Sequence, residues 1–168
     1  MKTTAHKLVL SALLAALTCV ATMIIRLPSV LGGYINLGDA VVLASAFLLP
    51  KGYMFLSAGL GSALADLFAG YAVYAPATFV IKGLMTIFAF DVFKLLHKKT
   101  TSLAAQITGA VVAEIWMISG YLIFESFIYG FIPSLVNIPA NAVQGVAGIV
   151  VGLMLTKFLR KAKVFGHE

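Results

Sequence analysis

The chain has 168 residues, of which 61% are hydrophobic and 11% are charged, whereas a soluble domain has about 25% charged residues. This composition excludes water-soluble globular, disordered and fibrous proteins and predicts an integral membrane protein. The net charge of +6 does not indicate a nucleic-acid partner, because the basic residues flank the apolar segments and report topology. A single cysteine, Cys19, excludes an internal disulfide and a cysteine-based metal site.

Six apolar segments follow one another along the chain, and a helix that spans a bilayer needs about 20 mostly apolar residues. They lie at about 8–25, 37–50, 53–70, 77–96, 103–128 and 135–159. Proline, glycine and charge clusters separate them, as at Pro50-Lys51-Gly52 after the second segment. We expect an all-α integral membrane protein, with a single membrane domain of six transmembrane helices over residues 1–168. The second segment is short for a full span and is expected to be tilted, partly sunk or broken.

The first segment raises the question of a cleaved signal peptide, because Lys2 and Lys7 precede an apolar run. The run is longer than the apolar region of a signal peptide and has no clean small-x-small cleavage site. Thr18 before Cys19 also makes a poor lipoprotein cleavage site. We therefore expect this segment to be retained as a helix.

Small residues form two strips on the first segment, Ser11 with Ala15 and Ala12 with Ala16. Small-xxx-small pairs let helices approach closely in lipid, where no hydrophobic effect drives their association. The spacing alone leaves two interpretations open. The strips either pack inside the bundle or form a docking face for another membrane protein.

Ionisable side chains at membrane depth are costly and favour positions that face the protein interior or a cavity. Asn36 and Asp39 open the second segment at its outer side. Asp66 lies about 6 Å below the outer end of the third segment and Lys82 about 7.5 Å below that of the fourth, at 1.5 Å per residue. The matched depths and opposite charges predict an ion pair between Asp66 and Lys82.

Polar residues of the fifth and sixth segments share helical faces and lie mostly in the outer half. They are Glu114, Met117, Tyr121 and Glu125 in the fifth segment and Asn137, Asn141 and Gln144 in the sixth. An outward-facing polar pocket explains this bias better than structural polar contacts between helices. Its expected aromatic walls are Tyr34, Tyr71, Tyr74, Trp116 and Tyr121. Glu125 is expected to be interfacial only, and Tyr34 and Tyr71 are alternatively interfacial belt aromatics.

The basic residues orient the bundle. Ten of the twelve Lys and Arg residues fall on the side that holds both termini. They are Lys2, Lys7, Lys51, Lys94, Lys98, Lys99, Lys157, Arg160, Lys161 and Lys163. By the positive-inside rule this side is cytoplasmic, so we expect a multi-pass membrane protein with both termini in the cytoplasm.

Several chemistries have no residues to support them in this sequence. It has no G-x-x-x-x-G-K-[ST] motif, which excludes ATP binding by a P-loop. His6, His97 and His167 all lie outside the apolar segments, which leaves no histidine for a metal site or for catalysis inside the membrane. We therefore predict that the protein is not an enzyme and has no cofactor, metal site or nucleic-acid partner.

Four short stretches together resemble a known family. They are Tyr34-Ile35-Asn36-Leu37-Gly38-Asp39-Ala40, Gly61-Ser62-Ala63-Leu64-Ala65-Asp66-Leu67, Tyr74-Ala75-Pro76-Ala77-Thr78 and Ile81-Lys82-Gly83-Leu84. Their order and spacing, with six helices and an Ala-x-x-x-Ala pair in the first, resemble the substrate-binding S components of energy-coupling factor (ECF) vitamin transporters. Within that family the sequence is most similar to the hydroxymethylpyrimidine and pyridoxine group.

The resemblance implies a location in a prokaryotic plasma membrane, a function and a set of partners. An S component captures a vitamin with high affinity in an outward pocket, which the loop between the first two helices caps. It docks on a membrane coupling (T) subunit, which two cytoplasmic ATPases drive. The resemblance favours docking through the small-residue face of the first helix, which consists of Ser11, Ala12, Ala15 and Ala16.

The resemblance also suggests the residues that bind the substrate. They are Asn36, Asp39, Lys82, Glu114, Trp116, Asn141 and Gln144, supported by Asp66, Tyr74 and Tyr121. Amides and carboxylates suit the edge of a small nitrogen heterocycle, and Trp116 is expected to stack on the ring. One buried lysine against several acids argues against a strongly anionic substrate, so we expect a neutral or weakly basic ring such as pyridoxine or hydroxymethylpyrimidine. A self-sufficient secondary transporter or channel is the main alternative, followed by an intramembrane enzyme.

Overall fold

The computed structural model describes residues 3–29 and 34–162, and nearly all of them are helical. The helices are α1 (Thr4–Ile24), α2 (Gly38–Leu48), α3 (Lys51–Phe68), α4 (Ala75–Leu96), α5 (Ser102–Tyr129), α6 (Phe131–Ser134) and α7 (Ile138–Lys161). A 3-10 turn (Leu135–Asn137) joins α6 to α7, and the strands β1 (Arg26–Pro28) and β2 (Tyr34–Asn36) lie between α1 and α2. Apart from the single-turn α6, the helices match the six predicted segments, which confirms the all-α membrane fold.

The described helices differ in length and in apolar composition, the two properties that indicate a membrane span. Three stretches are long and apolar enough to cross a bilayer: Thr4–Ile24, Ser102–Tyr129 and Phe131–Lys161. Helix α4 is long, but Lys82, Asp91 and Lys94 interrupt its apolar run. Because helices that carry charges in a membrane turn them towards the protein interior or the surface, α4 is expected to hold functional side chains.

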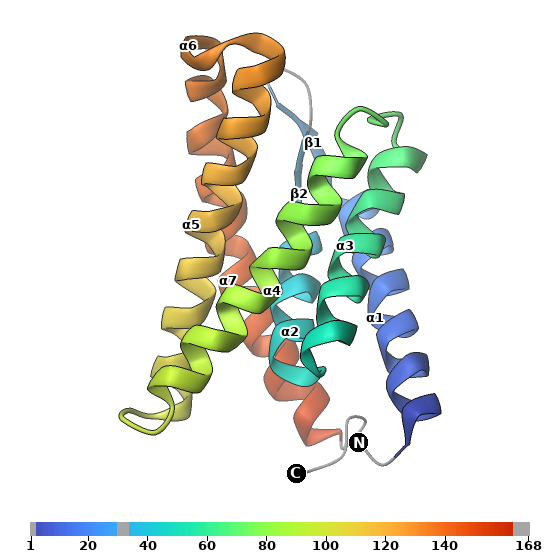
Figure 1. Cartoon of the computed structure of the whole chain (residues 1–168), viewed down its shortest axis with the longest axis vertical. Helices are drawn as coiled ribbons and strands as arrows, with labels where there is room; N and C mark the ends of the chain where they lie inside the picture. The colour runs from blue at the N-terminus through green and yellow to red at the C-terminus, as the bar shows by residue number, and fades with distance from the viewer. Residues whose placement is uncertain (1–2, 30–33, 163–168) are drawn as a thin grey trace.

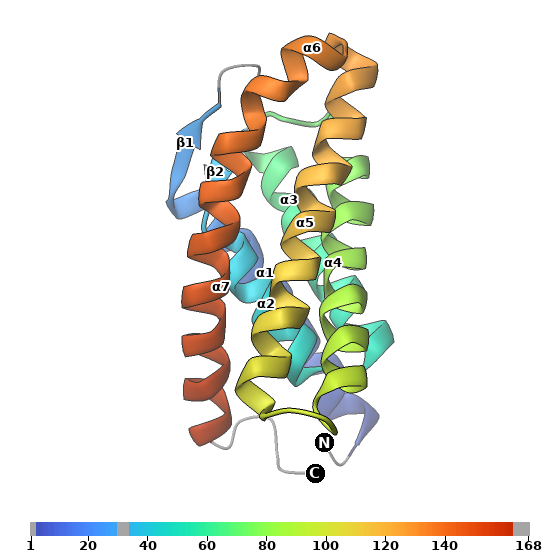
Figure 2. The same cartoon turned by 90° about the vertical axis from the view of Figure 1, so that its left-hand side faces the viewer.

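Helix α2 occupies the centre of the bundle. It has 11 residues, which gives it a length of about 16 Å, roughly half of a bilayer core about 30 Å thick. It packs against α1, α3, α4 and α7, and every residue from Gly38 to Phe47 is buried. Figures 1 and 2 show it enclosed by the longer helices. The short second segment is therefore a helix sunk into the inner half of the protein.

The contact between α1 and α3 separates the two small-residue strips. The Ser11 hydroxyl donates a hydrogen bond of 3.1 Å to the backbone oxygen of Tyr53. Ala15 lies against Gly61 of α3. A side chain at position 61 would collide with the backbone oxygen of Ala15. Ser11 is buried and Ala15 half-buried in this contact, whereas Ala12 and Ala16 are exposed on the other side of α1. Ser11 and Ala15 are therefore internal packing residues, contrary to the prediction that they belong to a docking face.

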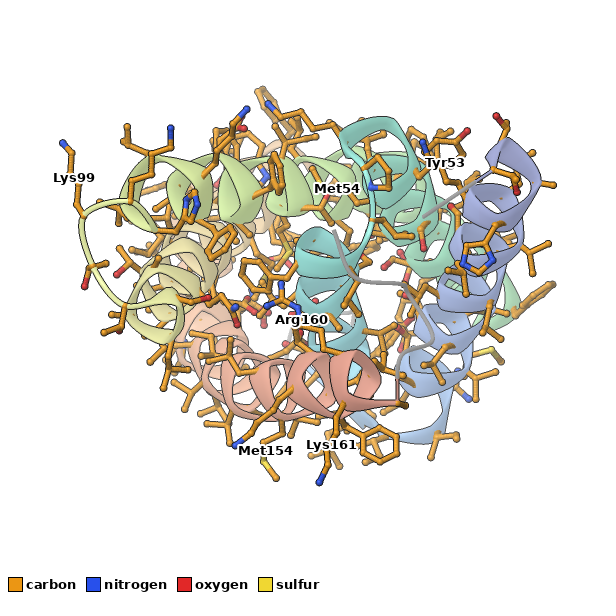
Figure 3. All side chains as sticks on the ribbon, turned by 90° about the horizontal axis from the view of Figure 1, so that it is seen from below. Tyr53, Met54, Lys99, Met154, Arg160 and Lys161 are labelled. Atoms are coloured by element: carbon orange, nitrogen blue, oxygen red, sulfur yellow. The ribbon has the colours of Figure 1, made fainter. Side chains whose placement is uncertain are left out.

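The end of the bundle where α1 begins and α7 ends is called the inner end below (Figure 1). There the Lys51 ammonium pairs with the Asp91 carboxylate at 2.5 Å. Seen from this end in Figure 3, Arg160 points into the bundle, whereas Lys99 and Lys161 lie at its periphery. The Arg160 guanidinium donates a hydrogen bond of 2.9 Å to the Phe47 backbone oxygen, near the C-terminal end of α2. This bond satisfies a carbonyl that the end of the helix leaves free.

A short antiparallel hairpin fills the outer part of the structure, where the sequence predicts only a loop. Strands β1 and β2 pair with Arg26 opposite Asn36 and Pro28 opposite Tyr34. Figure 2 places the hairpin beside the outer half of α7, above α2. Strand β1 rises from the outer end of α1, and the antiparallel β2 leads back down into the middle of the bundle, where α2 begins (Figures 1 and 2).

Candidate functional site

A pocket lies in the outer half of the bundle. Its empty space amounts to about 420 Å³, including the part that opens to solvent. It is lined by Ser29, Tyr34, Asn36, Asp66, Tyr71, Tyr74, Thr78, Tyr121, Glu125, Asn137, Asn141 and Gln144. These residues come from the hairpin, α3, the α3–α4 connection, α4, α5, the 3-10 turn and α7. The pocket occupies the space above α2, which begins at mid-depth.

The hairpin is fastened over this space by hydrogen bonds to distant helices. The backbone N–H of Asn36 donates to Gln144 Oε1 at 2.8 Å, and the Asn36 side chain donates to the same oxygen at 3.2 Å. The Tyr34 hydroxyl donates to Asp66 Oδ1 at 2.7 Å, and the Ser29 hydroxyl donates to Asn137 Oδ1. Burial and the nearby Asp66 carboxylate raise the pKa of Tyr34 well above its usual range, so this hydroxyl remains a donor.

A buried ion pair lies below the floor of the pocket. The Lys82 ammonium on α4 binds Asp39 Oδ1 on α2, and Gln144 on α7 donates to Asp39 Oδ2 at 2.6 Å. The predicted Asp66–Lys82 ion pair is therefore wrong, because Asp39 binds the ammonium and Asp66 accepts from Tyr34. Depth along a helix gives the height of a side chain but not the direction in which it points, and the direction decides the partner.

The upper wall contains a second carboxylate. Glu125 Oε1 accepts hydrogen bonds from Asn137 Nδ2 at 2.9 Å and from the Tyr74 hydroxyl at 3.4 Å. Glu125 is only 4% exposed and lines the pocket, so the expectation of a merely interfacial residue is wrong. Its Oε2 atom and the Oδ2 atom of Asp66 are buried and receive no hydrogen bond from any described group.

Tyrosines form the aromatic wall. The rings of Tyr34 and Tyr71 lie 5.0 Å apart and those of Tyr71 and Tyr74 lie 6.3 Å apart. The Tyr121 hydroxyl shares a hydrogen bond of 3.1 Å with Thr78. Tyr34 and Tyr71 line the pocket, which sets aside the alternative of belt aromatics for both.

Trp116 lies outside the pocket. Its indole N–H donates to the Ile81 backbone oxygen at 3.1 Å, and its ring packs on Phe88 with centroids 5.0 Å apart. It joins α5 to α4 and does not line the pocket. The expectation that Trp116 stacks on the substrate is therefore wrong for this structure.

The other predicted site residues form two groups. Six line the pocket: Asn36, Asn141, Gln144, Asp66, Tyr74 and Tyr121. Three lie below it and do not line it: Asp39, Lys82 and Glu114. Sequence reasoning did not assign Ser29, Thr78, Glu125 or Asn137 to the site. Asn137 had a signal in its shared spacing with Asn141 and Gln144, whereas nothing in the sequence distinguishes Ser29 or Thr78.

Comparisons with known proteins agree with this arrangement. A family model described as the ECF-type riboflavin transporter, S component, matches residues 2–161. A Pyrococcus woesei protein, described as an uncharacterized protein in the gap 3' region, is 33% identical over 143 residues, which cover 84% of this chain and 93% of that protein. The specific hydroxymethylpyrimidine and pyridoxine group that the sequence suggested stays a prediction.

A solved structure has the same fold. It is described as the S component of a bacterial ECF transporter, and it superposes with a TM-score of 0.76 at 24% identity. The match covers 95% of this chain and 98% of the other. The family match over almost the whole length is the finding that assigns the chain: it belongs to the S components of ECF-type transporters, the substrate-binding subunits of these prokaryotic membrane transporters.

Proposed function

We propose that this S component captures a neutral or weakly basic aromatic nitrogen heterocycle, a vitamin or vitamin precursor, in the outer pocket. As a member of its family it works with a membrane T subunit and ATPases. The residues that line the pocket indicate which kind of heterocycle it binds.

The observation that carries this proposal is the pair of unsatisfied carboxylate oxygens, Asp66 Oδ2 and Glu125 Oε2. A buried acceptor without a donor costs about 1–3 kcal/mol. A ligand with N–H or O–H donors towards both oxygens recovers that free energy on binding. Asn141 also lines the pocket and can both donate and accept, which suits the edge of a heterocycle.

The charges of the lining residues disfavour an anionic ligand. None of the described lining residues is a lysine or arginine, whereas Asp66 and Glu125 both line the pocket. Lys82 lies below the floor and is bound by Asp39. A phosphate or carboxylate on the ligand would lose its hydration without gaining a cation in return. We therefore propose the free vitamin, and not a phosphorylated form, as the substrate.

Three compounds fit this description and form the first test set. Riboflavin comes first because the matching family model carries its name, and its flat neutral ring with a chain of hydroxyl groups suits the tyrosine walls and the two acceptor oxygens. Pyridoxine and hydroxymethylpyrimidine are the smaller members, and the sequence resemblance favours them.

The experiment is calorimetric titration of the purified, ligand-free protein with each of the three compounds. Flavin mononucleotide, pyridoxine 5′-phosphate and hydroxymethylpyrimidine phosphate serve as the phosphorylated controls. We expect one of the three to bind and its phosphate ester to bind at least about tenfold more weakly, a difference of about 1.4 kcal/mol. A phosphate ester that binds as tightly as the free compound contradicts the proposed charge preference. Mass spectrometry of small molecules that co-purify with the protein tests the same point without a preselected set.

We further propose that the exposed Ala12–Ala16 strip of α1 is the docking face for the T subunit. Both residues are exposed, and a close helix–helix approach needs such small side chains. Ala12→Trp and Ala16→Trp should therefore abolish vitamin uptake by the complete transporter in cells and leave ligand binding to the isolated protein unchanged. Normal uptake by both variants would move the docking face elsewhere.

The same measurements distinguish an S component from a self-sufficient transporter. The protein alone in liposomes should bind its ligand and not accumulate it, because accumulation depends on the T subunit and the ATPases. Accumulation by the isolated chain would support the alternative of a secondary transporter or channel.

A further inference from the structure

Glu114 is a buried ionisable residue outside the pocket. Glu114 on α5 does not line it and is 4% exposed. Helix α5 runs from Ser102 to Tyr129, so Glu114 lies about 18 Å from its inner end and about 22 Å from its outer end at 1.5 Å per residue. The carboxyl group is therefore placed near the middle of the membrane.

The carboxyl group of Glu114 takes part in no hydrogen bond within the described part of the chain. Both carboxyl oxygens are buried and receive no hydrogen bond from any described group. Helix α7 closes over them with glycines: a side chain at Gly148 would come within 2.9 Å of Glu114 Oε1, and one at Gly145 within 3.1 Å of Oε2. The bare surface of α7 thus accommodates the carboxyl group without bonding to it.

Two charged residues act on this group. They are Asp39 from α2 and Lys82 from α4. Helix α7 faces Glu114 with Gly145 and Gly148, which carry no charge. On α5 itself the nearest titratable group is Tyr121, whose ring lies 5.4 Å from the Lys82 ammonium. Asp39, Lys82 and Glu114 are called the polar layer below.

The charge count of the polar layer requires a further positive charge. Lys82 is already bound by Asp39, so these two residues are neutral together. An ionised Glu114 would leave the layer with a net charge of −1 in the middle of the membrane, at a depth where an unpaired charge is strongly unfavourable. A proton on Glu114 removes that charge and converts the group into a donor.

We propose that the polar layer is a proton-binding site in which Glu114 carries the proton, and that this proton is linked to the pocket. Asp39 binds Gln144, and Gln144 binds the hairpin at Asn36. Loss of the proton makes Glu114 repel Asp39 and compete with it for Lys82, and the repulsion displaces the Asp39 carboxylate from its position against Gln144. The hairpin is therefore held more firmly in the protonated state and less firmly as the pH rises.

Infrared spectroscopy of the purified protein tests the proton directly, because a protonated carboxyl group has a carbonyl band that a carboxylate lacks. We expect Glu114→Gln to remove one component of this band at neutral pH. Asp91→Asn is the matched control, because the Asp91 side chain is 45% accessible and is paired with Lys51, and it should leave the band unchanged. A band of equal intensity in the wild type and in Glu114→Gln would overturn the proposal.

A second measurement uses the single tryptophan of the chain, since Trp116 lies two residues from Glu114 and bonds to α4. We expect a reversible fluorescence change of the wild-type protein between neutral and alkaline pH that Glu114→Gln abolishes. The wild-type titration needs no variant, so it stands even if the variant does not fold. The absence of any change in the wild type, or a change that follows added Na⁺ at constant pH, would contradict a proton site.

The link to the hairpin has its own test. A spin label at Leu27→Cys, in a Cys19→Ser background, reports the mobility of β1, where Leu27 is 59% exposed. We expect mobility to increase at alkaline pH and this increase to be absent when Glu114→Gln is added. Equal mobility at both pH values would show that the proton is not linked to the pocket.

Discussion

The buried hydroxyl groups of the inner half and the polar groups of the outer half differ in their usual partners, although Ser11 and Arg160 of the inner half also bond to distant backbone oxygens. In the inner half, the hydroxyls of Ser45, Thr86 and Thr156 donate to backbone oxygens three or four residues earlier in their own helices. In the outer half, the bond from Tyr34 to Asp66 spans 32 residues and the bond from Asn36 to Gln144 spans 108. Intrahelical bonds satisfy a group without fixing the tertiary structure, whereas the long-range bonds position one element against another.

This difference bears on the two interpretations of the outer polar residues. Polar contacts that serve only to join helices would be expected to pair all of their donors and acceptors with one another. The outer half instead leaves Asp66 Oδ2 and Glu125 Oε2 unsatisfied beside an empty space. The arrangement favours a binding pocket over structural polar contacts.

The largest effect is expected for the ion pair at the boundary of the two halves. Lys82→Met leaves Asp39 buried and unpaired, which should lower the free energy of unfolding by about 3–5 kcal/mol. Asp39→Asn combined with Lys82→Met should recover much of this loss, because no charge is then stranded. The measurement is denaturant-induced or thermal unfolding in detergent.

Lys51→Met is the matched control for this substitution. Lys51 pairs with Asp91 at the inner end, where the side chains are 51% and 45% exposed. An exposed ion pair contributes about 0–1 kcal/mol, so the control should be almost neutral. Equal effects of Lys82→Met and Lys51→Met would mean that the Asp39–Lys82 pair is not buried as described.

An intermediate effect is expected for the two amide residues of α7, Asn141 and Gln144, which differ in their hydrogen bonds. Asn141 takes no part in the chain of bonds from Asn36 through Gln144 to Asp39, so Asn141→Ala should weaken ligand binding by about 1–3 kcal/mol and leave the melting temperature unchanged. Gln144→Ala should lower both, because it also releases Asp39 and the hairpin. Calorimetry and thermal melting of the same samples check this, and identical behaviour of the two variants would contradict it.

The smallest effect is expected in the inner half. Thr156 donates to the Gly152 backbone oxygen within α7, and Thr156→Val removes only this local bond. The change should alter the free energy of unfolding by no more than about 0.5 kcal/mol and leave ligand affinity as it is. A loss of affinity in Thr156→Val would show that the inner half takes part in binding, which removes the distinction between the two halves.

The six helices were predictable because the lengths of apolar runs can be determined from the sequence alone. Pro50 with Gly52 marked the boundary between α2 and α3. The hairpin was not predictable, since its strands have three residues each and their pairing depends on the helices around them. The chemistry of the pocket was visible in residue types such as Asn141 and Gln144. The partner of Lys82 and the orientation of Trp116 were not, because both depend on how each helix is rotated about its axis.

The half-length of α2 has a mechanical consequence. Helix α7 holds it at both ends, through Gln144 and Asp39 at the pocket floor and through Arg160 and the Phe47 carbonyl at the inner surface. A short rod that is fastened to a longer one at two points can neither tilt nor slide independently of it. Helices α2 and α7 therefore move as one rigid unit between the pocket and the inner surface. A displacement imposed at either end of this unit is transmitted to the other end.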